Sequence, residues 1–301
     1  MGADAAARLD IEPAMHGADT VPAAAIQSAL ERQQREEKDM SIVINHTKRQ
    51  LREGKLALGL GLRSARTVDI AQLARTADFD WLFIDCEHNS MGTDTAAQIA
   101  AAALTVGITP LVRVPGYEHY LASRMLDNGA QGIVVPHVET AEHAHRIAQY
   151  CRFPPLGQRS MGGPLQQVGF TPMPVGEMSR AVNEETLVVV MLESPAGIAN
   201  CEAIAAVPGI DVLLIGTTDL SFELGVPGQF DDPRIEDAYR KVIAACHRHG
   251  KFPGMGGVYV PEIMQRFVDM GARFILSGSD FGLLQQAATA RAAMIRGLLR
   301  G

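Results

Sequence analysis

The sequence predicts an α/β fold of the (β/α)8 barrel class, also called a TIM barrel. After residue 55, eight short and almost continuously apolar runs alternate with amphipathic helical patterns. Such runs are typical of parallel strands that are buried on both faces. Eight repeats of this unit close most naturally into a barrel, with a doubly wound open sheet as the alternative. The length of 301 residues and the 47% hydrophobic content suit one large α/β domain as well as two smaller ones.

The beginning of the chain differs from the rest. Residues 1–21 are rich in Ala, Asp and Gly without apolar periodicity, and residues 22–40 form a polar helical pattern with a thin apolar face. We therefore predict an N-terminal arm over residues 1–40, disordered or helical, and a barrel domain over residues 41–301. Thr47 is the expected cap of a short helix that leads into the first strand.

The barrel elements follow in order after this short helix. The predicted strands are the apolar runs 56–62, 81–86, 110–114, 132–138, 187–192, 211–216, 252–257 and 274–279. The helical patterns that follow them span 64–77, 93–106, 119–129, 140–151, 197–207, 235–250, 260–271 and 282–299. The weakest strand is "FPGMGG" at 252–257, although glycines are tolerated where barrel strands crowd.

Composition argues against several kinds of partner. A formal net charge of −7 and a pI near 5.7 argue against nucleic acid, which proteins bind through clustered Lys and Arg. No apolar stretch reaches the roughly 18 residues that a membrane span needs, and the first residues lack an apolar signal core. The four cysteines form no CxxC pair, which predicts free thiols, a cytoplasmic location and no zinc site.

Polar residues follow the predicted strands. In a barrel, the carboxyl ends of the strands form one mouth, where such enzymes hold their active sites. The residues predicted at this mouth are Arg63, Ser64, Asp85, Glu87, His88, Arg113, His137, Glu193, Thr217, Thr218, Asp219, Ser279 and Asp280.

Two of these residues, Glu193 and Asp219, end neighbouring strands. Two like charges this close are unfavourable without a cation between them, and carboxylate oxygens with open positions suit Mg or Mn. Taken singly, Glu193 could be a carboxylate at a helix entry and Asp219 an N-cap, and His88 a satisfied loop histidine. Arg113 lies inside an apolar strand, where it must meet an anion. The predicted strands contain no lysine, which disfavours a Schiff-base mechanism.

Six segments carry a resemblance to a known family. They are "FDWLFIDCEHNSMG", "PLVRVPG", "MLDNGAQGIVVPHVETAEHA", "FPPLGQRSMGG", "MLESPAGIANCEAIAAVPGIDVLLIGTTDLS" and "GKFPGMGG". In order and in content, they resemble the HpcH/HpaI aldolases, the metal-dependent pyruvate aldolases. The likeness runs from about residue 55 to residue 290, so the first 40 residues lie outside it.

The resemblance implies where metal and substrate bind. It assigns Glu193 and Asp219 to a divalent ion, either Mg, Mn or Co. It also assigns the backbone of the segment that begins Gly216, Thr217, Thr218 to the carboxylate of pyruvate. This segment reads "GTTD", where the family more often has GPxD.

The resemblance also implies catalytic roles. His88 matches the histidine of an acid/base relay, Asp127 the aspartate that orients this histidine, and Arg113 the arginine that stabilises the pyruvate enolate. Met191 replaces the glutamine that the family often has two residues before the metal-binding glutamate. Residues 191 and 193 have the same parity on a strand, so we expect Met191 beside the substrate.

These assignments predict a metal-dependent lyase. It would reversibly cleave a 4-hydroxy-2-oxo acid into pyruvate, or a related 2-oxo acid, and an aldehyde. One alternative is a C–C lyase acting on CoA esters or citrate with the same barrel, and another is a metal-binding barrel without catalytic activity. The resemblance implies a homotrimer or a homohexamer, whose acceptor pockets include residues of neighbouring subunits.

Overall fold

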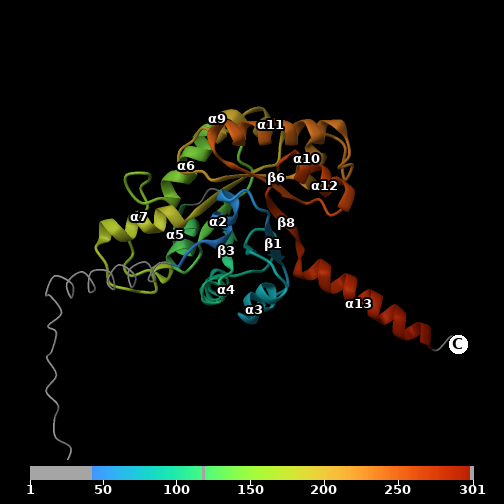
Figure 1. The fold of residues 1–301 in the computed structure, drawn as a ribbon, viewed down its shortest axis with the longest axis horizontal. Helices are drawn as coiled ribbons and strands as arrows, with labels where there is room; N and C mark the ends of the chain where they lie inside the picture. Colours follow the sequence, from blue (N-terminus) through green and yellow to red (C-terminus); the bar gives the residue numbers. More distant parts are fainter. Residues whose placement is uncertain (1–42, 117–118, 299–301) are drawn as a thin grey trace, which may run out of the picture. The chain divides into compact units, whose positions relative to one another are not determined.

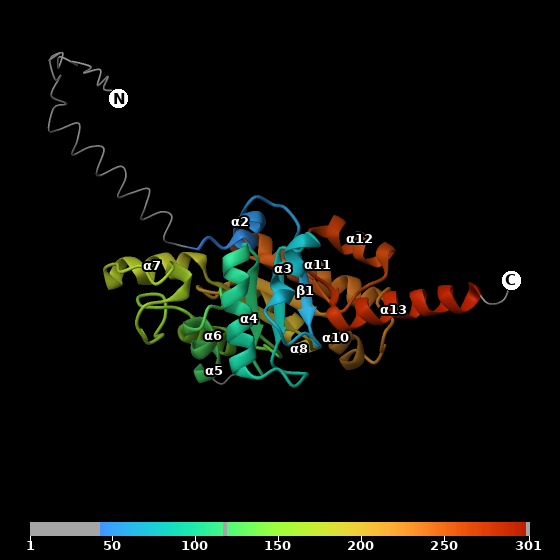
Figure 2. The ribbon, with the colours of Figure 1, turned by 90° about the horizontal axis from the view of Figure 1, so that it is seen from below.

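A closed parallel barrel forms the fold of the computed structural model, which describes residues 43–116 and 119–298 (Figures 1 and 2). Its strands follow the order β1 to β8, and each pairs in parallel with its neighbours. The predicted (β/α)8 class is confirmed. The predicted arm over residues 1–40, and the domain boundary at residue 41, lie outside the described residues and stay predictions.

The elements occur at or close to the predicted places. The strands are β1 (Ala57–Leu62), β2 (Trp81–Asp85), β3 (Thr109–Arg113), β4 (Gly132–Val135), β5 (Leu187–Leu192), β6 (Val212–Gly216), β7 (Phe252–Gly256) and β8 (Phe274–Ser279). The helices are α2 (His46–Arg52), α3 (Asp69–Thr76), α4 (Thr93–Val106), α5 (His119–Asp127), α6 (Ala141–Cys151), α7 (Val175–Glu185), α8 (Pro195–Ala199), α9 (Cys201–Ala205), α10 (Thr217–Glu223), α11 (Pro233–His249), α12 (Pro261–Met270) and α13 (Asp280–Gly297), with a short 3₁₀ turn at Gln166–Val168.

Three local expectations were wrong. Asn45, and not Thr47, caps α2, since the Asn45 side chain accepts the amide of Lys48 at 2.9 Å. The helix predicted over 197–207 is divided into α8 and α9 at Asn200. The Asn200 side chain donates a hydrogen bond to the carbonyl of Glu139. The strand predicted over 132–138 ends at Val135.

Large side chains fill the amino-terminal end of the barrel. The rings of Trp81 and Phe274, the first residues of β2 and β8, stack with centroids 4.1 Å apart. Gly59 of β1 makes room for this stack, because a Cβ there would lie 2.2 Å from the Trp81 ring. Beneath it, Lys48 of α2 is buried and pairs with Asp211 at 3.0 Å. The open space of the barrel therefore lies at the carboxyl ends of the strands.

The last helix, α13, differs from the others. None of its 18 residues is buried, and Figures 1 and 2 show it running away from the barrel after β8. Its exposed apolar side chains include Phe281, Leu284 and Ile295, which expose 54%, 66% and 53% of their surface. A helix that leaves so much apolar surface in water has no packing partner within the described part of the chain. No helix among the described residues is long and apolar enough to cross a membrane.

Candidate active site

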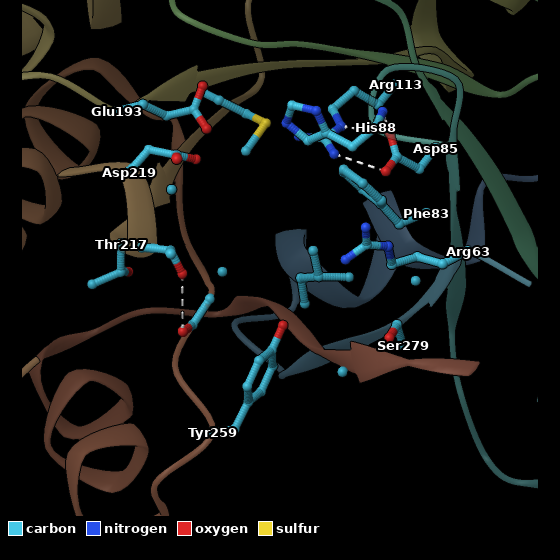
Figure 3. A pocket seen from close by; sticks show the side chains of 18 residues that line it. Arg63, Phe83, Asp85, His88, Arg113, Glu193, Thr217, Asp219, Tyr259 and Ser279 are labelled. Carbon is cyan, nitrogen blue, oxygen red and sulfur yellow. Dashed lines mark hydrogen bonds and ion pairs between the residues drawn. The ribbon is translucent and has the colours of Figure 1, made fainter. Parts of the chain in front are cut away.

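Most of the predicted mouth residues line one cavity of about 380 Å³ at the carboxyl ends of the strands (Figure 3). Ser64, Glu87, His137 and Asp280 are not part of its lining. Its lining includes most of the residues assigned from the sequence, namely His88, Arg113, Met191, Glu193, Gly216, Thr217, Thr218 and Asp219. Further lining side chains come from Arg63, Phe83, Asp85, Tyr259, Leu276 and Ser279. Asp127 does not line the cavity.

The carboxylates Glu193 and Asp219 differ in exposure. Glu193 follows β5 and is only 3% exposed, whereas Asp219 is exposed in the first turn of α10, which begins directly after β6. Burial, the largest cause, and the negative charge of Asp219 raise the pKa of Glu193, while the contacts with His137 and the charge of Arg113 lower it, and the net pKa is about 7. The charged form of Glu193 is thus poorly compensated by the protein alone.

His137 holds the Glu193 carboxylate in place, and Gly216 leaves room for it. The His137 backbone amide donates to Glu193 Oε2 at 2.9 Å, and His137 Nδ1 lies 3.3 Å from the same oxygen. His137 adopts a positive φ of 54°, unusual for a residue other than glycine, and this turn aims its amide at Glu193. Gly216 leaves space on the other side, because a Cβ there would lie 2.5 Å from Oε1. The sequence placed His137 at the mouth but gave it no role.

This donor set fits a divalent ion that keeps several open positions. Glu193 and Asp219 offer hard carboxylate oxygens, the ligands that Mg and Mn prefer. Among the described residues, no group of three or more His, Cys, Asp or Glu side chains is arranged to hold a metal. The remaining ligands would therefore come from water or substrate oxygens.

Arg113 is fixed by two acidic neighbours. Its Nε and Nη2 donate to the two oxygens of Asp85 at 2.9 and 2.8 Å, and Nη1 lies 2.8 Å from Glu87 Oε2. Asp85 and Arg113 are register partners of β2 and β3, so both side chains point to the same face. Burial alone would raise the pKa of Asp85, but the hydrogen bonds and charge of Arg113 outweigh it and lower the pKa. The guanidinium also lies over the Phe83 ring.

His88 lies at the rim of the cavity. Its side chain is 54% exposed, with Nε2 3.5 Å from Glu87 Oε2. The carboxylate of Asp85 accepts the backbone amides of Glu87 and His88 at 3.0 and 3.4 Å and so shapes the loop that carries the histidine. The ring is therefore accessible from both the solvent and the cavity.

The structure does not bring Asp127 to His88 within one chain. Asp127 ends α5 a few residues before β4 begins at Gly132, so it lies towards the amino ends of the strands. There its carboxylate accepts from Arg159 at 2.7 Å. The orienting role of Asp127 therefore stays a prediction, and within one chain the carboxylate that shapes the His88 loop is Asp85.

The Gly216–Asp219 segment and Met191 also line the cavity. The Thr217 hydroxyl is buried and shares a 2.7 Å hydrogen bond with the Tyr239 hydroxyl, so only its backbone can serve a ligand. Thr218 is exposed. Met191 is 5% exposed and packs with the apolar cluster inside the barrel while still lining the cavity.

One protein family and several known proteins are similar to this chain. Residues 60–287 match the family described as HpcH/HpaI aldolase/citrate lyase. A 4-hydroxy-4-methyl-2-oxoglutarate aldolase of Hapsidospora irregularis is 42% identical over 240 residues, covering 78% of this chain and 88% of that protein. A 4-hydroxy-2-oxovalerate aldolase of Novosphingobium aromaticivorans is 37% identical over 246 residues, covering 80% and 90%. The crystal structure of an HpcH/HpaI aldolase from Desulfitobacterium hafniense DCB-2 superposes with a TM-score of 0.78 at 30% identity, covering 83% and 96%.

Proposed function

Since the chain belongs to the HpcH/HpaI aldolase/citrate lyase family, we propose that it reversibly cleaves a 4-hydroxy-2-oxo acid into pyruvate, or a related 2-oxo acid, and an aldehyde. The resemblance read from the sequence is confirmed, and the protein is a carbon–carbon lyase of the aldolase type. The observation that carries the proposed reaction is the shared cavity, which Glu193, Asp219, Arg113 and His88 all line.

A divalent ion, Mg, Mn or Co, is part of the proposal. Glu193 and Asp219 are the residues that would hold it. When bound, such an ion supplies a Lewis acid that favours the enolate of a 2-oxo acid by several kcal/mol. The raised pKa of Glu193 supports this assignment, because a buried carboxylate beside a second carboxylate is stabilised by a cation.

Two side chains would act on the two fragments of the substrate, His88 on the aldehyde fragment and Arg113 on the enolate. Cleavage of the C3–C4 bond turns C4 into the aldehyde carbonyl, while the electron pair of the bond forms the C2–C3 double bond of the enolate. His88 would take the proton of the C4 hydroxyl, directly or through water, and a proton would then add to C3. Arg113, held by Asp85, places a fixed positive charge towards the enolate oxygen, where exclusion of water strengthens it.

Pyruvate release from 4-hydroxy-2-oxovalerate tests this function. We expect release with added Mg, Mn or Co and none in excess chelator. A protein that leaves this substrate intact but cleaves citrate or a CoA ester would instead support the citrate-type alternative. A protein that binds the metal without any turnover would support the non-catalytic barrel.

A homo-oligomer, either a trimer or a hexamer, also belongs to the proposal. The unburied apolar side chains of α13 support it, because a second copy could cover them. We expect Leu284→Lys, which places a charge on this apolar surface, to lower the mass of the assembly. Sedimentation equilibrium measures it, with the exposed Lys241→Ala on α11 as the control variant. A monomeric wild type, or an assembly unaffected by Leu284→Lys, would contradict this role of α13.

A cytoplasmic location is likewise proposed, and the free cysteines of the described chain support it.

Met191→Gln tests whether this position selects the 2-oxo acid. We expect nearly unchanged metal affinity, since both carboxylates remain, and a roughly fivefold shift of donor preference towards pyruvate, the effect of about one hydrogen bond that a thioether cannot donate. The measurement is kcat/KM for aldol addition with pyruvate and with 2-oxobutanoate as donors. An unchanged ratio would mean that Met191 only packs in the barrel interior.

A further inference from the structure

Arg63 approaches the cavity on the side away from the carboxylate pair. It directly follows β1, and Figure 3 shows its guanidinium and the Tyr259 hydroxyl pointing into the cavity across from Glu193 and Asp219. Burial raises the pKa of Tyr259 while the charge of Arg63 lowers it, so the two groups lie within electrostatic reach. The cavity thus has an acidic side and a side with hydrogen-bond donors.

Arg63 differs from the other cationic groups of this cavity. The Arg113 guanidinium faces Asp85 and Glu87, and His88 faces Glu87. The Arg63 guanidinium makes no hydrogen bond and no ion pair with any residue that the structure describes. It is therefore the cavity cation whose charge remains available to an anionic ligand.

The backbone that carries Arg63 is firmly held. The Asp280 carboxylate at the start of α13 accepts the amides of Arg63, Ser64 and Ala65 at 2.8, 3.0 and 2.6 Å. Three hydrogen bonds to one carboxylate fix the turn after β1. The exposed side chain consequently starts from a fixed point at the cavity rim, and no backbone freedom is lost when it binds a ligand.

We propose that Arg63, assisted by Tyr259, binds a carboxylate on the fragment that leaves as the aldehyde. A guanidinium fork matches a carboxylate with two parallel hydrogen bonds, and a phenol can donate a third. The 2-oxo acid end would lie at Glu193 and Asp219, so the second carboxylate lies at the far end of the substrate. This inference rests on the proposed function and assigns Arg63 as the residue that would distinguish dicarboxylic from monocarboxylic 4-hydroxy-2-oxo acids.

Two substrates that differ in one group test the inference. 4-Hydroxy-2-oxoglutarate carries a carboxylate where 4-hydroxy-2-oxovalerate carries a methyl group, and cleavage gives pyruvate with glyoxylate or with acetaldehyde. We expect the wild type to prefer the dicarboxylate. In Arg63→Ala, the ratio of the two kcat/KM values should fall by about 10- to 100-fold, the range for a hydrogen bond to a charged group. Arg63→Lys keeps the charge without the fork and should fall between the two.

The controls separate this site from the rest of the reaction. Arg240→Ala removes the same charge from the exposed surface of α11, outside the cavity, and should leave the ratio unchanged. Equal losses on both substrates in Arg63→Ala, or a wild type without preference for the dicarboxylate, would overturn the carboxylate site alone. Failure of the wild type to exchange the methyl protons of pyruvate with metal present would overturn the proposed function, and the carboxylate site with it.

Discussion

Glu193→Gln and Asp219→Asn are each expected to lose divalent metal and aldolase turnover together. Each change removes one of the two carboxylates that the cavity offers to a cation. Loss of a Lewis acid worth several kcal/mol corresponds to a decrease in kcat of about 10³-fold or more. Titration of the apoprotein with Mn, followed by its electron paramagnetic resonance signal, measures binding independently of turnover. If either variant bound Mn with wild-type affinity and turned over at the wild-type rate, Glu193 and Asp219 would not be the metal-binding residues.

Glu193→Gln should also stabilise the metal-free protein at high pH. Burial raises the folded-state pKa of Glu193 to about 7 from the ordinary 4.5, so the folded chain binds the proton more tightly than the unfolded chain. Between these two values the free energy of unfolding therefore falls as pH rises, by about 3 kcal/mol in total for this group. Glutamine carries no such charge and avoids the loss.

Urea unfolding in chelator, at pH 5 and pH 8, measures this stability difference. Asp219→Asn is the matched comparison, because Asp219 is exposed and its replacement should change stability less than Glu193→Gln does. A Glu193→Gln protein that is less stable than the wild type at pH 8 would contradict this. It would mean that hydrogen bonds and charges of the protein itself stabilise the charged carboxylate, so that no cation is needed.

Arg113→Ala is expected to lower kcat by about 10² to 10³-fold, because it removes a fixed charge from the place where the enolate oxygen develops. It should also destabilise the fold by about 3 to 5 kcal/mol, since Asp85 is 4% exposed and would be left without its cation. Arg113→Lys keeps a charge but loses the paired hydrogen bonds to Asp85. We expect this variant to fold and still to lose most of its rate.

Two measurements separate catalysis from folding in these variants. Thermal melting reports the fold, and exchange of pyruvate methyl protons reports enolate formation. Added guanidinium should restore part of the exchange rate of Arg113→Ala, because it returns a planar cation to the vacated space. A folded Arg113→Lys protein that exchanges protons at the wild-type rate would make Arg113 a structural residue.

The strands and most of the mouth could be predicted because their signal is local. A buried parallel strand reads as an apolar run, and the residue that ends it must lie at the mouth of the barrel. This logic led directly to Glu193, to Asp219 and to the exposed rim histidine, His88. Even the glycine-rich β7 was found, because the repeat required a strand between two clear helices.

The contacts that the sequence did not reveal depend on geometry between elements. Asp127 ends α5 and accepts from Arg159 within one chain, and the role that its motif implies towards His88 stays a prediction. The role of His137 depends on its positive φ, and a positive φ at a residue other than glycine cannot be predicted from the sequence. Pairing of Asp85 with Arg113 follows from the register of β2 and β3, which apolar patterns do not fix.

The sequence did not reveal that α13 lacks a packing partner among residues 43–116 and 119–298. Its pattern, 282–299, reads as an ordinary barrel helix, since Leu and Ile recur among alanines. An apolar helix face shows that something covers it, but not whether the cover is the same barrel or another copy.

Proton exchange of pyruvate in deuterated water tests the central claim most directly. The reaction needs enolate formation at the cavity but no aldehyde, so it is independent of the unknown acceptor. We expect the methyl signal of pyruvate to disappear in proton NMR when wild-type protein and Mg, Mn or Co are present. Exchange should stop in excess chelator and in Glu193→Gln. Exchange that persists in both, or wild-type protein that catalyses none with any of the three ions, would contradict a metal-dependent aldolase at Glu193 and Asp219.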